Sequence, residues 1–264
     1  MKAIILAAGL GNRLLPLTED KPKCLIEFSG KTLLERLLKT FKSCGINDIV
    51  LVSGHKSEKI NYADLDLVKN EKYSKTGIIH SLFCAREKFE KTVIVTYGDI
   101  IFEDSVLEKL LKSKYDITAV VDKKWKRYWD LRTDDPLSDT ESLLMDEKNF
   151  ITNIGEKNLK DFDKICGQFI GLIMFQNKGL NDLKDFFRKI FYETSKESNP
   201  LNPNVVFEQS TLTNFLQGMI MNGHKIKAIP IENGWLEFDT VKDLEIYNKM
   251  LTNNTLSDFI NIQD

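Results

Sequence analysis

The sequence predicts an α/β fold of three layers, with helices on both faces of a mainly parallel mixed sheet. Over the first 122 residues, apolar runs typical of buried strands alternate with amphipathic stretches. Such alternation indicates βαβ units. At 264 residues, without a sharp break in composition, the chain is expected to form one domain over 1–264.

The first elements are a strand, a helix and a second strand. Ala3–Leu6 is a short apolar run typical of a buried strand. Apolar residues at helical spacing follow, with Thr32 and Glu35 as a capping box and Gly45 as the predicted stop. The apolar run at 48–54 is the next predicted strand.

Two further helix–strand pairs complete the first half. A helix is predicted over Ile78–Phe89, followed by a strand at 92–99 that ends in an acid. Ser105 and Glu108 are predicted to cap another helix, and the run at 116–122 is a strand.

The second half is less regular. Residues 123–167 are polar and aromatic, and we expect an insertion with short strands there. The polar segment 194–204 is predicted to be a mobile loop. The remaining expected elements are strands at 168–175 and 225–231 and helices at 180–192, 211–222 and 240–251.

Composition excludes several classes of protein. A formal net charge of -2 gives no basic field for nucleic acid or an anionic membrane surface. The four cysteines form no CxxC pair and the three histidines are scattered, which argues against a zinc site. No apolar run approaches the roughly 20 residues of a membrane span, and the opening run is short for a signal peptide. We therefore expect a cytoplasmic protein with reduced thiols and no membrane partner.

The stretch "LAAGLGNRLLPLTEDKPKCL" (6–25) places a glycine-rich, basic loop directly after the first strand. It is not a dinucleotide fingerprint, because Leu14 stands where the third glycine belongs. Glycines after a parallel strand let backbone N–H groups approach a ligand, and Arg13 and Lys23 supply charges for phosphates. The alternative is a solvated basic loop without function.

This loop resembles the G-x-G-x-R…P-K signature of nucleotidyltransferases that join a nucleoside triphosphate to a phosphorylated small molecule. Sugar-1-phosphate nucleotidylyltransferases and phosphocholine cytidylyltransferases belong to this group. The resemblance covers nearly the whole chain and implies a Rossmann-like fold of the GT-A type. It implies that Arg13 holds the departing pyrophosphate and that Lys23 bridges the α-phosphate and the incoming phosphate. The nucleotide-binding residues that it implies are Leu6, Ala8, Gly9, Gly11, Gly77 and Ser81.

Two acids are candidates for binding Mg²⁺, by the same resemblance. Asp99 lies in "YGDIIF", and Asp239 lies in "GWLEFDTVKDL". Reaction between two polyanions requires cations, and Mg²⁺ prefers oxygen ligands. The alternatives are a turn residue for Asp99 and a helix N-cap for Asp239. The expected reaction is direct attack of the acceptor's phosphate oxygen on the α-phosphorus, without a covalent enzyme intermediate.

The segment 70–85 corresponds to the base-recognition region in this resemblance. Asn70, Tyr73, Ser81 and Leu82 match the outline of the phosphocholine-type branch, which favours CTP. Leu82 has the alternative role of helix core, so Gly77 and Ser81 are the stronger candidates for base contacts.

The stretch 121–143 resembles phosphocholine-cytidylyltransferase-like enzymes linked to bacterial surface polysaccharides, including those that act on phosphoglutamine for capsule phosphoramidate. Its acceptor would be phosphoglutamine or phosphocholine, and 123–167 would form a lid over it. Gln168 replaces a glutamate of many relatives, which weakens the case for a cationic choline. Core packing is the alternative for the two tryptophans, and a surface position is the alternative for Lys157. The candidate acceptor-binding residues are Trp125, Trp129, Arg132, Glu141, Lys157, Gln168 and Glu237.

Three other functions are weighed against this one. A GT-A glycosyltransferase should carry a D-x-D motif, whereas "YGDIIF" has one aspartate. A non-catalytic nucleotide-binding module should lack the cations and acids that are present here. A hexose-1-phosphate nucleotidylyltransferase using UTP, dTTP or GTP is the main rival. The sequence gives no indication of oligomeric state.

Overall fold

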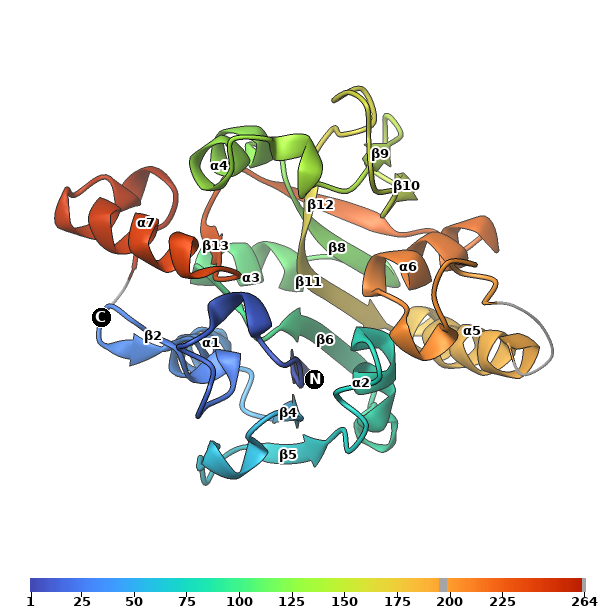
Figure 1. Ribbon diagram of the computed structural model, residues 1–264. Helices are drawn as coiled ribbons and strands as arrows, with labels where there is room; N and C mark the ends of the chain where they lie inside the picture. The colour runs from blue at the N-terminus through green and yellow to red at the C-terminus, as the bar shows by residue number, and fades with distance from the viewer. Residues whose placement is uncertain (195–198, 263–264) are drawn as a thin grey trace.

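A seven-stranded sheet forms the middle layer of the computed structural model, which describes residues 1–194 and 199–262 (Figure 1). The strand order is β12-β8-β11-β6-β1-β4-β5, with β11 antiparallel to both neighbours and the other pairs parallel. This confirms the predicted mainly parallel mixed sheet. The strands are β1 (Lys2–Ala7), β4 (Ile49–Ser53), β5 (Asp66–Lys69), β6 (Thr92–Tyr97), β8 (Ile117–Asp122), β11 (Gln168–Gln176) and β12 (Lys227–Ile231).

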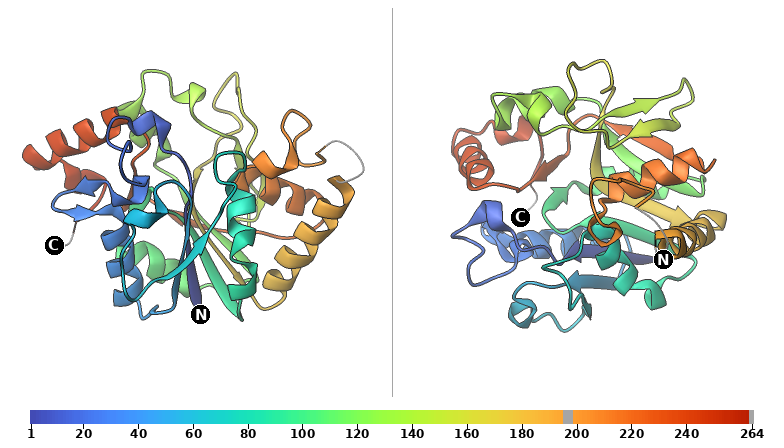
Figure 2. Two further views of the ribbon diagram at one scale, coloured as in Figure 1. Left: turned by 60° about the horizontal axis from the view of Figure 1, so that its bottom comes forward. Right: turned by 45° about the vertical axis from the view of Figure 1, so that its right-hand side comes forward.

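Helices pack on both faces of this sheet, as the turned views in Figure 2 show. Alternate residues of a strand point to opposite faces. Ile5 accordingly belongs to a core with α1 and α3, whereas Ile4 belongs to a core with α2, α5 and α6. The three predicted layers are therefore present. The α-helices are α1 (Leu33–Ser43), α2 (Ile78–Cys84), α3 (Asp104–Leu111), α4 (Trp125–Arg132), α5 (Lys178–Thr194), α6 (Leu212–Met221) and α7 (Val241–Thr252).

Helix ends agree with the sequence at some positions and differ at others. The capping box at α1 is confirmed, with Glu35 N donating to Thr32 Oγ1 at 3.1 Å and Thr32 N to Glu35 Oε2 at 2.7 Å. The expected cap at Ser105 is wrong, because Glu103 is the N-cap of α3 and the Ser105 hydroxyl donates to its carboxylate. The helix predicted over 78–89 ends at Cys84 and continues as a 3₁₀ turn.

Several short strands were not predicted, because two or three residues carry too little pattern to be recognised. Among them, β7 (Ile100–Phe102) and β13 (Trp235–Glu237) pair antiparallel. The segment 123–167 contributes α4 and the hairpin of β9 (Leu143–Met145) with β10 (Ile151–Ile154), at the top of Figure 1. The remaining strands are β2 (Glu27–Phe28) and β3 (Lys31–Thr32).

Part of the predicted loop 194–204, residues 195–198, lies outside the described residues. In the part of the chain that the structure describes, no helix is long and apolar enough to cross a membrane.

Candidate active site

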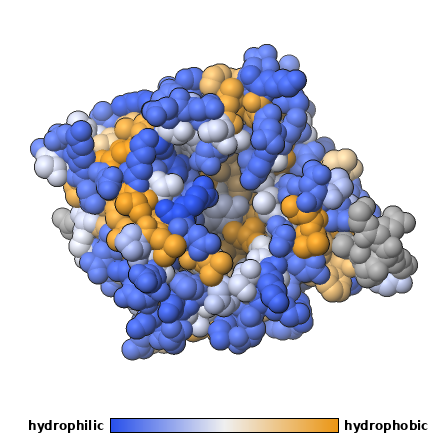
Figure 3. Space-filling model, viewed as in Figure 1, coloured by the Kyte–Doolittle hydropathy of each residue, from blue (hydrophilic) through white to orange (hydrophobic). Residues whose placement is uncertain are grey.

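A cleft of about 350 Å³ opens at the carboxyl ends of β1 and β6, where ligands of open α/β sheets bind. Figure 3 shows the hollow on this face of the molecule. β1 ends in the cleft with Leu6 and Ala7, and β6 ends there with Tyr97. Because β11 runs antiparallel to β6, its first residues also reach this edge of the sheet.

The glycine-rich loop is held by its own hydrogen bonds. Gly11 has a φ of +68°, in the left-handed region that favours glycine, and the Thr18 hydroxyl donates to its carbonyl at 2.9 Å. The Thr18 carbonyl lies 3.1 Å from His55 Nε2. Gly11 thus shapes the loop, whereas Gly9 lines the cleft directly.

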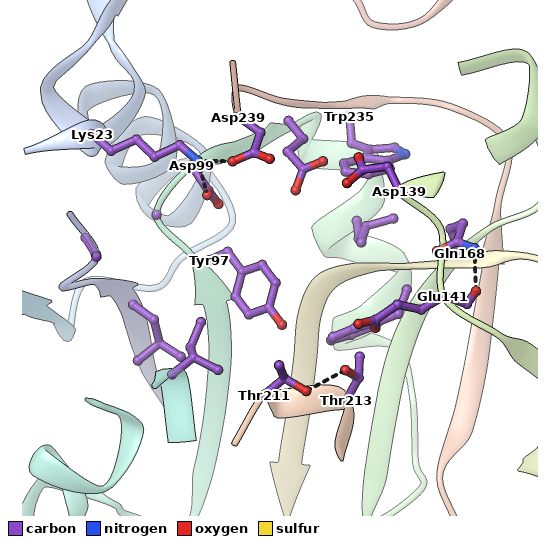
Figure 4. Close-up of a pocket in the computed structure, with 18 of the residues that line it drawn as sticks. Lys23, Tyr97, Asp99, Asp139, Glu141, Gln168, Thr211, Thr213, Trp235 and Asp239 are labelled. Atoms are coloured by element: carbon purple, nitrogen blue, oxygen red, sulfur yellow. Dashed lines mark hydrogen bonds and ion pairs between the residues drawn. The ribbon is translucent and has the colours of Figure 1, made fainter. Parts of the chain in front are cut away.

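Lys23 lies between the two candidate metal-binding acids, as Figure 4 shows. Its Nζ donates to Asp99 Oδ2 at 2.7 Å and to Asp239 Oδ1 at 2.8 Å. Burial by itself would lower the pKa of Lys23, but the charges of Asp99 and Asp239 outweigh burial and raise it. Arg13 forms an ion pair with the second oxygen of Asp239. The sequence placed Arg13 and Lys23 in one loop and the two acids in distant segments, and the structure brings all four residues together.

The short pair β7–β13 explains how residues 140 positions apart meet. Asp99 is in the turn between β6 and β7, and its carbonyl accepts from Phe238 N at 2.9 Å. Asp239 follows β13 and is not a helix cap, because Thr240 is the N-cap of α7. The helix-cap alternative for Asp239 is therefore wrong, and its carboxylate lines the cleft, where it pairs with Lys23 and Arg13.

The two acids fit a hydrated divalent cation. Asp99 Oδ1 is buried and accepts no hydrogen bond from the described residues, so its charge is not fully compensated by protein. The described residues contain no cluster of three or more His, Cys, Asp or Glu side chains arranged to bind a metal. Mg²⁺ commonly uses one or two carboxylates and completes its shell with waters and phosphates. Asp99 and Asp239 suit that mode of binding rather than a closed protein cage.

A smaller pocket of about 200 Å³ joins the cleft and shares Leu6, Gly9 and Ile78 with it. Five of the six residues that the sequence assigned to nucleotide binding line this pocket, and Gly11 is the exception. The five are Leu6, Ala8, Gly9, Gly77 and Ser81. Leu82 is fully buried in the core, as its alternative role predicted. Tyr73 and Thr76 also line this pocket.

Asn70 organises the wall of the smaller pocket. Its side-chain amide donates to Ser81 Oγ at 3.0 Å and to Thr76 Oγ1 at 2.9 Å. Gly77 contacts a second segment closely, since a Cβ there would lie 2.8 Å from the backbone of Gln209. The wall of the pocket at Gly77 therefore packs on a segment far away in the sequence, which residue spacing could not reveal.

The far end of the cleft contains three of the predicted acceptor residues, Trp129, Glu141 and Gln168. Gln168 Nε2 donates to the backbone carbonyl of Glu141 at 2.8 Å (Figure 4), whereas the Glu141 carboxylate pairs with Lys157. Thr211 and Thr213, paired at 2.9 Å, line the same end. Glu237 lines the cleft near Asp239.

Three other predicted acceptor residues lie outside the lining of the cleft. Trp125 is buried against Trp129 and Phe162, so the core-packing alternative describes it. Lys157 is exposed, and its Nζ lies 3.5 Å from Glu141. Arg132 is buried and forms ion pairs with two carboxylates, which removes it from direct contact with an acceptor. Trp125 and Arg132 thus have protein partners and do not line the cleft.

Sequence reasoning missed several residues that line the cleft. Tyr97 adjoins Asp99 and could have been found by its position at the strand end. The threonines at the start of α6 show only a capping pattern, and nothing in the sequence distinguished Asp139 or Trp235. Tyr97, Asp139, Thr211, Thr213 and Trp235 are the missed residues that we consider most relevant.

The cleft lacks an ionised cysteine at neutral pH. Cys24 lines it, but burial raises the pKa of the Cys24 thiol to about 12. Because the thiolate is the nucleophilic form, Cys24 is unsuited to covalent catalysis. This agrees with the expectation of direct attack between substrates.

The substitution Gly9→Ala tests whether a ligand approaches the loop. No described atom outside the adjoining residues lies within 4 Å of the position that a Cβ would occupy at Gly9, so the fold should accept alanine. A bound nucleotide, however, would meet the methyl group. We expect the melting temperature to stay within about 2 °C, since no named mechanism of destabilisation applies, while the KM for nucleotide rises about tenfold. An unchanged KM would separate this loop from nucleotide binding.

The fold and this site together define an α/β nucleotidyltransferase. The chain belongs to the family of MobA-like NTP transferase domains, whose family model matches residues 3–152. It is 35% identical over 257 residues to the CTP:phosphoglutamine cytidylyltransferase of Campylobacter jejuni subsp. jejuni serotype O:2, covering 93% of this chain and 98% of the relative. The resemblance inferred from the sequence is confirmed.

Two further similarities come from Streptococcus pneumoniae. The chain is 36% identical to a choline-phosphate cytidylyltransferase over 119 residues. This aligned region covers 44% of this chain and 52% of the relative. The solved structure of a CTP:phosphocholine cytidylyltransferase aligns over 95% of this chain and 98% of that chain, with a TM-score of 0.72 and 22% identity. At that identity the structural match supports the fold alone.

Proposed function

We propose that the chain is a CTP-dependent cytidylyltransferase that transfers CMP to a small phosphorylated acceptor and releases pyrophosphate. The observation that carries this proposal is the position of Lys23, held between Asp99 and Asp239 in the cleft that the smaller pocket joins. A base in the smaller pocket would place its phosphates beside Lys23. The name of the Campylobacter relative supports CTP as the nucleotide.

The residues of the cleft account for direct transfer. Lys23 would pair with the α-phosphate and with the acceptor phosphate, which lowers the repulsion between two anions and aligns them. Arg13, whose side chain is 64% exposed, can turn toward the leaving pyrophosphate. Asp99 and Asp239 would hold Mg²⁺. When bound, the ion would neutralise charge on the phosphates.

The acceptor would bind at the far end of the cleft. Glu141 supplies a carboxylate, Gln168 an amide and Trp129 an aromatic surface. These groups suit an amino group or an amide better than a second anion. Phosphoglutamine is the acceptor that we favour, and phosphocholine is the second candidate. In this proposal 123–167 covers the acceptor, and Lys157 reaches the acceptor from the rim.

We place this reaction in the cytoplasm, in the biosynthesis of a capsule polysaccharide. The reasons are the resemblance of 121–143 to enzymes of surface-polysaccharide decoration and the match to the Campylobacter relative. The net charge of -2 supports small-molecule partners rather than nucleic acid.

Magnesium-dependent release of pyrophosphate tests the proposed function. Each of CTP, UTP, dTTP and GTP is incubated with phosphoglutamine, phosphocholine, aminoethylphosphonate, glycerol phosphate or a hexose 1-phosphate. We expect release with CTP and a non-sugar phosphate, and none after chelation with EDTA. Release only with a hexose 1-phosphate would assign the chain to the sugar branch. Silence with every pair, together with CTP binding by calorimetry, would indicate a non-catalytic module.

A further inference from the structure

We propose that Arg132 is a positioning residue, which fixes Glu237 and the Asp239 backbone in the cleft from behind. This inference rests on the proposed function. Arg132 ends α4, and its side chain is 5% exposed, although the chain offers many exposed arginines and lysines. A buried guanidinium must be paired, and the identity of its partners shows what it holds.

The guanidinium of Arg132 binds two carboxylates on the segment that carries Asp239. Nη1 donates to Glu237 Oε2 at 2.6 Å. Nε and Nη2 donate to the two oxygens of Asp243 at 2.9 and 3.2 Å, which is the fork geometry of arginine with a carboxylate. All three donors are therefore directed at the strand–helix junction β13–α7.

Asp243 transmits this contact to Asp239. Its Oδ2 accepts from Asp239 N at 3.0 Å and from Thr240 N at 2.8 Å. The carboxylate that Arg132 grips thus holds the backbone of Asp239, whose side chain binds Lys23. A shift of Asp243 would move Asp239 relative to Lys23.

The backbone of Glu237 is fixed from the same side. Glu237 N donates to Tyr128 Oη at 2.7 Å, and Tyr247 Oη donates to the Glu237 carbonyl at 2.9 Å. With the main chain fixed and Oε2 bound to Arg132, the Glu237 side chain has one orientation toward the cleft. Helix α4 consequently supports the catalytic end of the cleft through Tyr128 and Arg132, rather than only the acceptor end.

Arginine is required for this arrangement, because lysine cannot reproduce the fork. Arg132→Lys keeps the positive charge but has one nitrogen donor, whereas three nitrogens of Arg132 donate to Glu237 and Asp243. The smaller pocket is built by other elements, so it should not change. We therefore expect kcat to fall about 10- to 100-fold, with the KM for CTP within about threefold of wild type.

The matched control is Arg127→Lys. Arg127 lies on the same helix and pairs with an aspartate, Asp258, at 3.2 Å, but it is 56% exposed and lies outside the lining of the cleft. Its replacement should leave kcat, KM and cation affinity unchanged. Comparing the two variants thus separates the general effect of replacing an arginine on α4 from the effect of losing the contacts of Arg132 with Glu237 and Asp243.

The test combines two measurements. Steady-state kinetics give kcat and KM, and electron paramagnetic resonance gives the affinity for Mn²⁺ in the presence of CTP. For Arg132→Lys we expect lower kcat, an unchanged KM for CTP and about tenfold weaker Mn²⁺ binding. If that variant does not fold, Asp243→Asn should give the same pattern. Wild-type kcat and Mn²⁺ affinity in a variant with a lowered melting temperature would reduce Arg132 to a purely structural role. A raised acceptor KM with intact kcat would make it an acceptor contact, and would equally overturn the proposal.

Failure of the proposed function gives a different result. In that case the wild-type protein releases no pyrophosphate with any pair of substrates. The Mn²⁺ measurement needs no acceptor and no turnover, so it still decides whether Arg132 positions Glu237 and Asp239.

Discussion

Replacing Lys23 with methionine is expected to lower kcat for pyrophosphate release by about 10²- to 10³-fold, the range for loss of one preorganised charge at a reacting centre. The buried ammonium lines the cleft and is held there by Asp99 and Asp239. Its contacts with phosphate should strengthen as charge develops during transfer. The effect should therefore appear mainly in kcat, with a smaller change in the KM for CTP.

Lys42→Met is the matched control for this substitution. Lys42 also pairs with an aspartate, Asp64 at 3.3 Å, but it is on α1 and outside the lining of the cleft. The rate of the Lys42→Met enzyme should equal that of wild type, since an exposed ion pair contributes only about 0–1 kcal/mol to stability. A Lys23→Met enzyme that keeps more than about one tenth of the wild-type rate would contradict the catalytic role of Lys23.

Asp239→Asn is expected to lower the rate by about 10²-fold or more. Asp239 binds Lys23 with one oxygen and Arg13 with the other, so its charge sets the position of both cations. The amide keeps the size of the side chain but removes the negative charge that a divalent cation requires. The Mg²⁺ concentration for half-maximal rate should rise together with the fall in kcat, as a titration of the variant would show.

An exposed aspartate provides the comparison for Asp239→Asn. Asp258 pairs with Arg127 at the surface, and Asp258→Asn should leave both the rate and the Mg²⁺ titration unchanged. If Asp239→Asn lost activity but kept the wild-type dependence on Mg²⁺, Asp239 would serve to place the cations of the protein and would not hold the metal.

The regular elements of the fold could be predicted because their signals are local. Ile4 and Ile5 lie in a continuous apolar run, which is typical of strands buried on both faces. The capping box of Thr32 and Glu35 uses residues three positions apart. The glycine-rich loop is likewise contiguous, so Lys23 could be recognised within a single short motif.

The assembly of the site could not be predicted, because it depends on pairings between distant segments. Asp99 meets Asp239 through β7 and β13, each only three residues long. Gly77 meets Gln209 across 131 intervening residues. No local pattern contains such contacts, so the threonines of α6 had no detectable link to the cleft.

The acceptor end shows a second limit of sequence reasoning. Trp125 and Trp129 share one helical face, as their spacing indicated, yet only Trp129 lines the cleft. Trp125 instead packs against Trp129 and Phe162, and these tertiary contacts cannot be deduced from helical spacing. Arg132 was expected to bind the acceptor because of its charge. In the structure it is buried and pairs with Glu237 and Asp243.

Isotope labelling distinguishes transfer of CMP to an acceptor phosphate from other reactions of CTP. CTP labelled with ³²P at the α-position or the γ-position is incubated with Mg²⁺ and phosphoglutamine. We expect the α-label to enter a product that still contains the acceptor, and the γ-label to appear only in pyrophosphate. Transfer of the γ-label to the acceptor, or an α-label found only in free CMP, would contradict the proposed transfer of CMP.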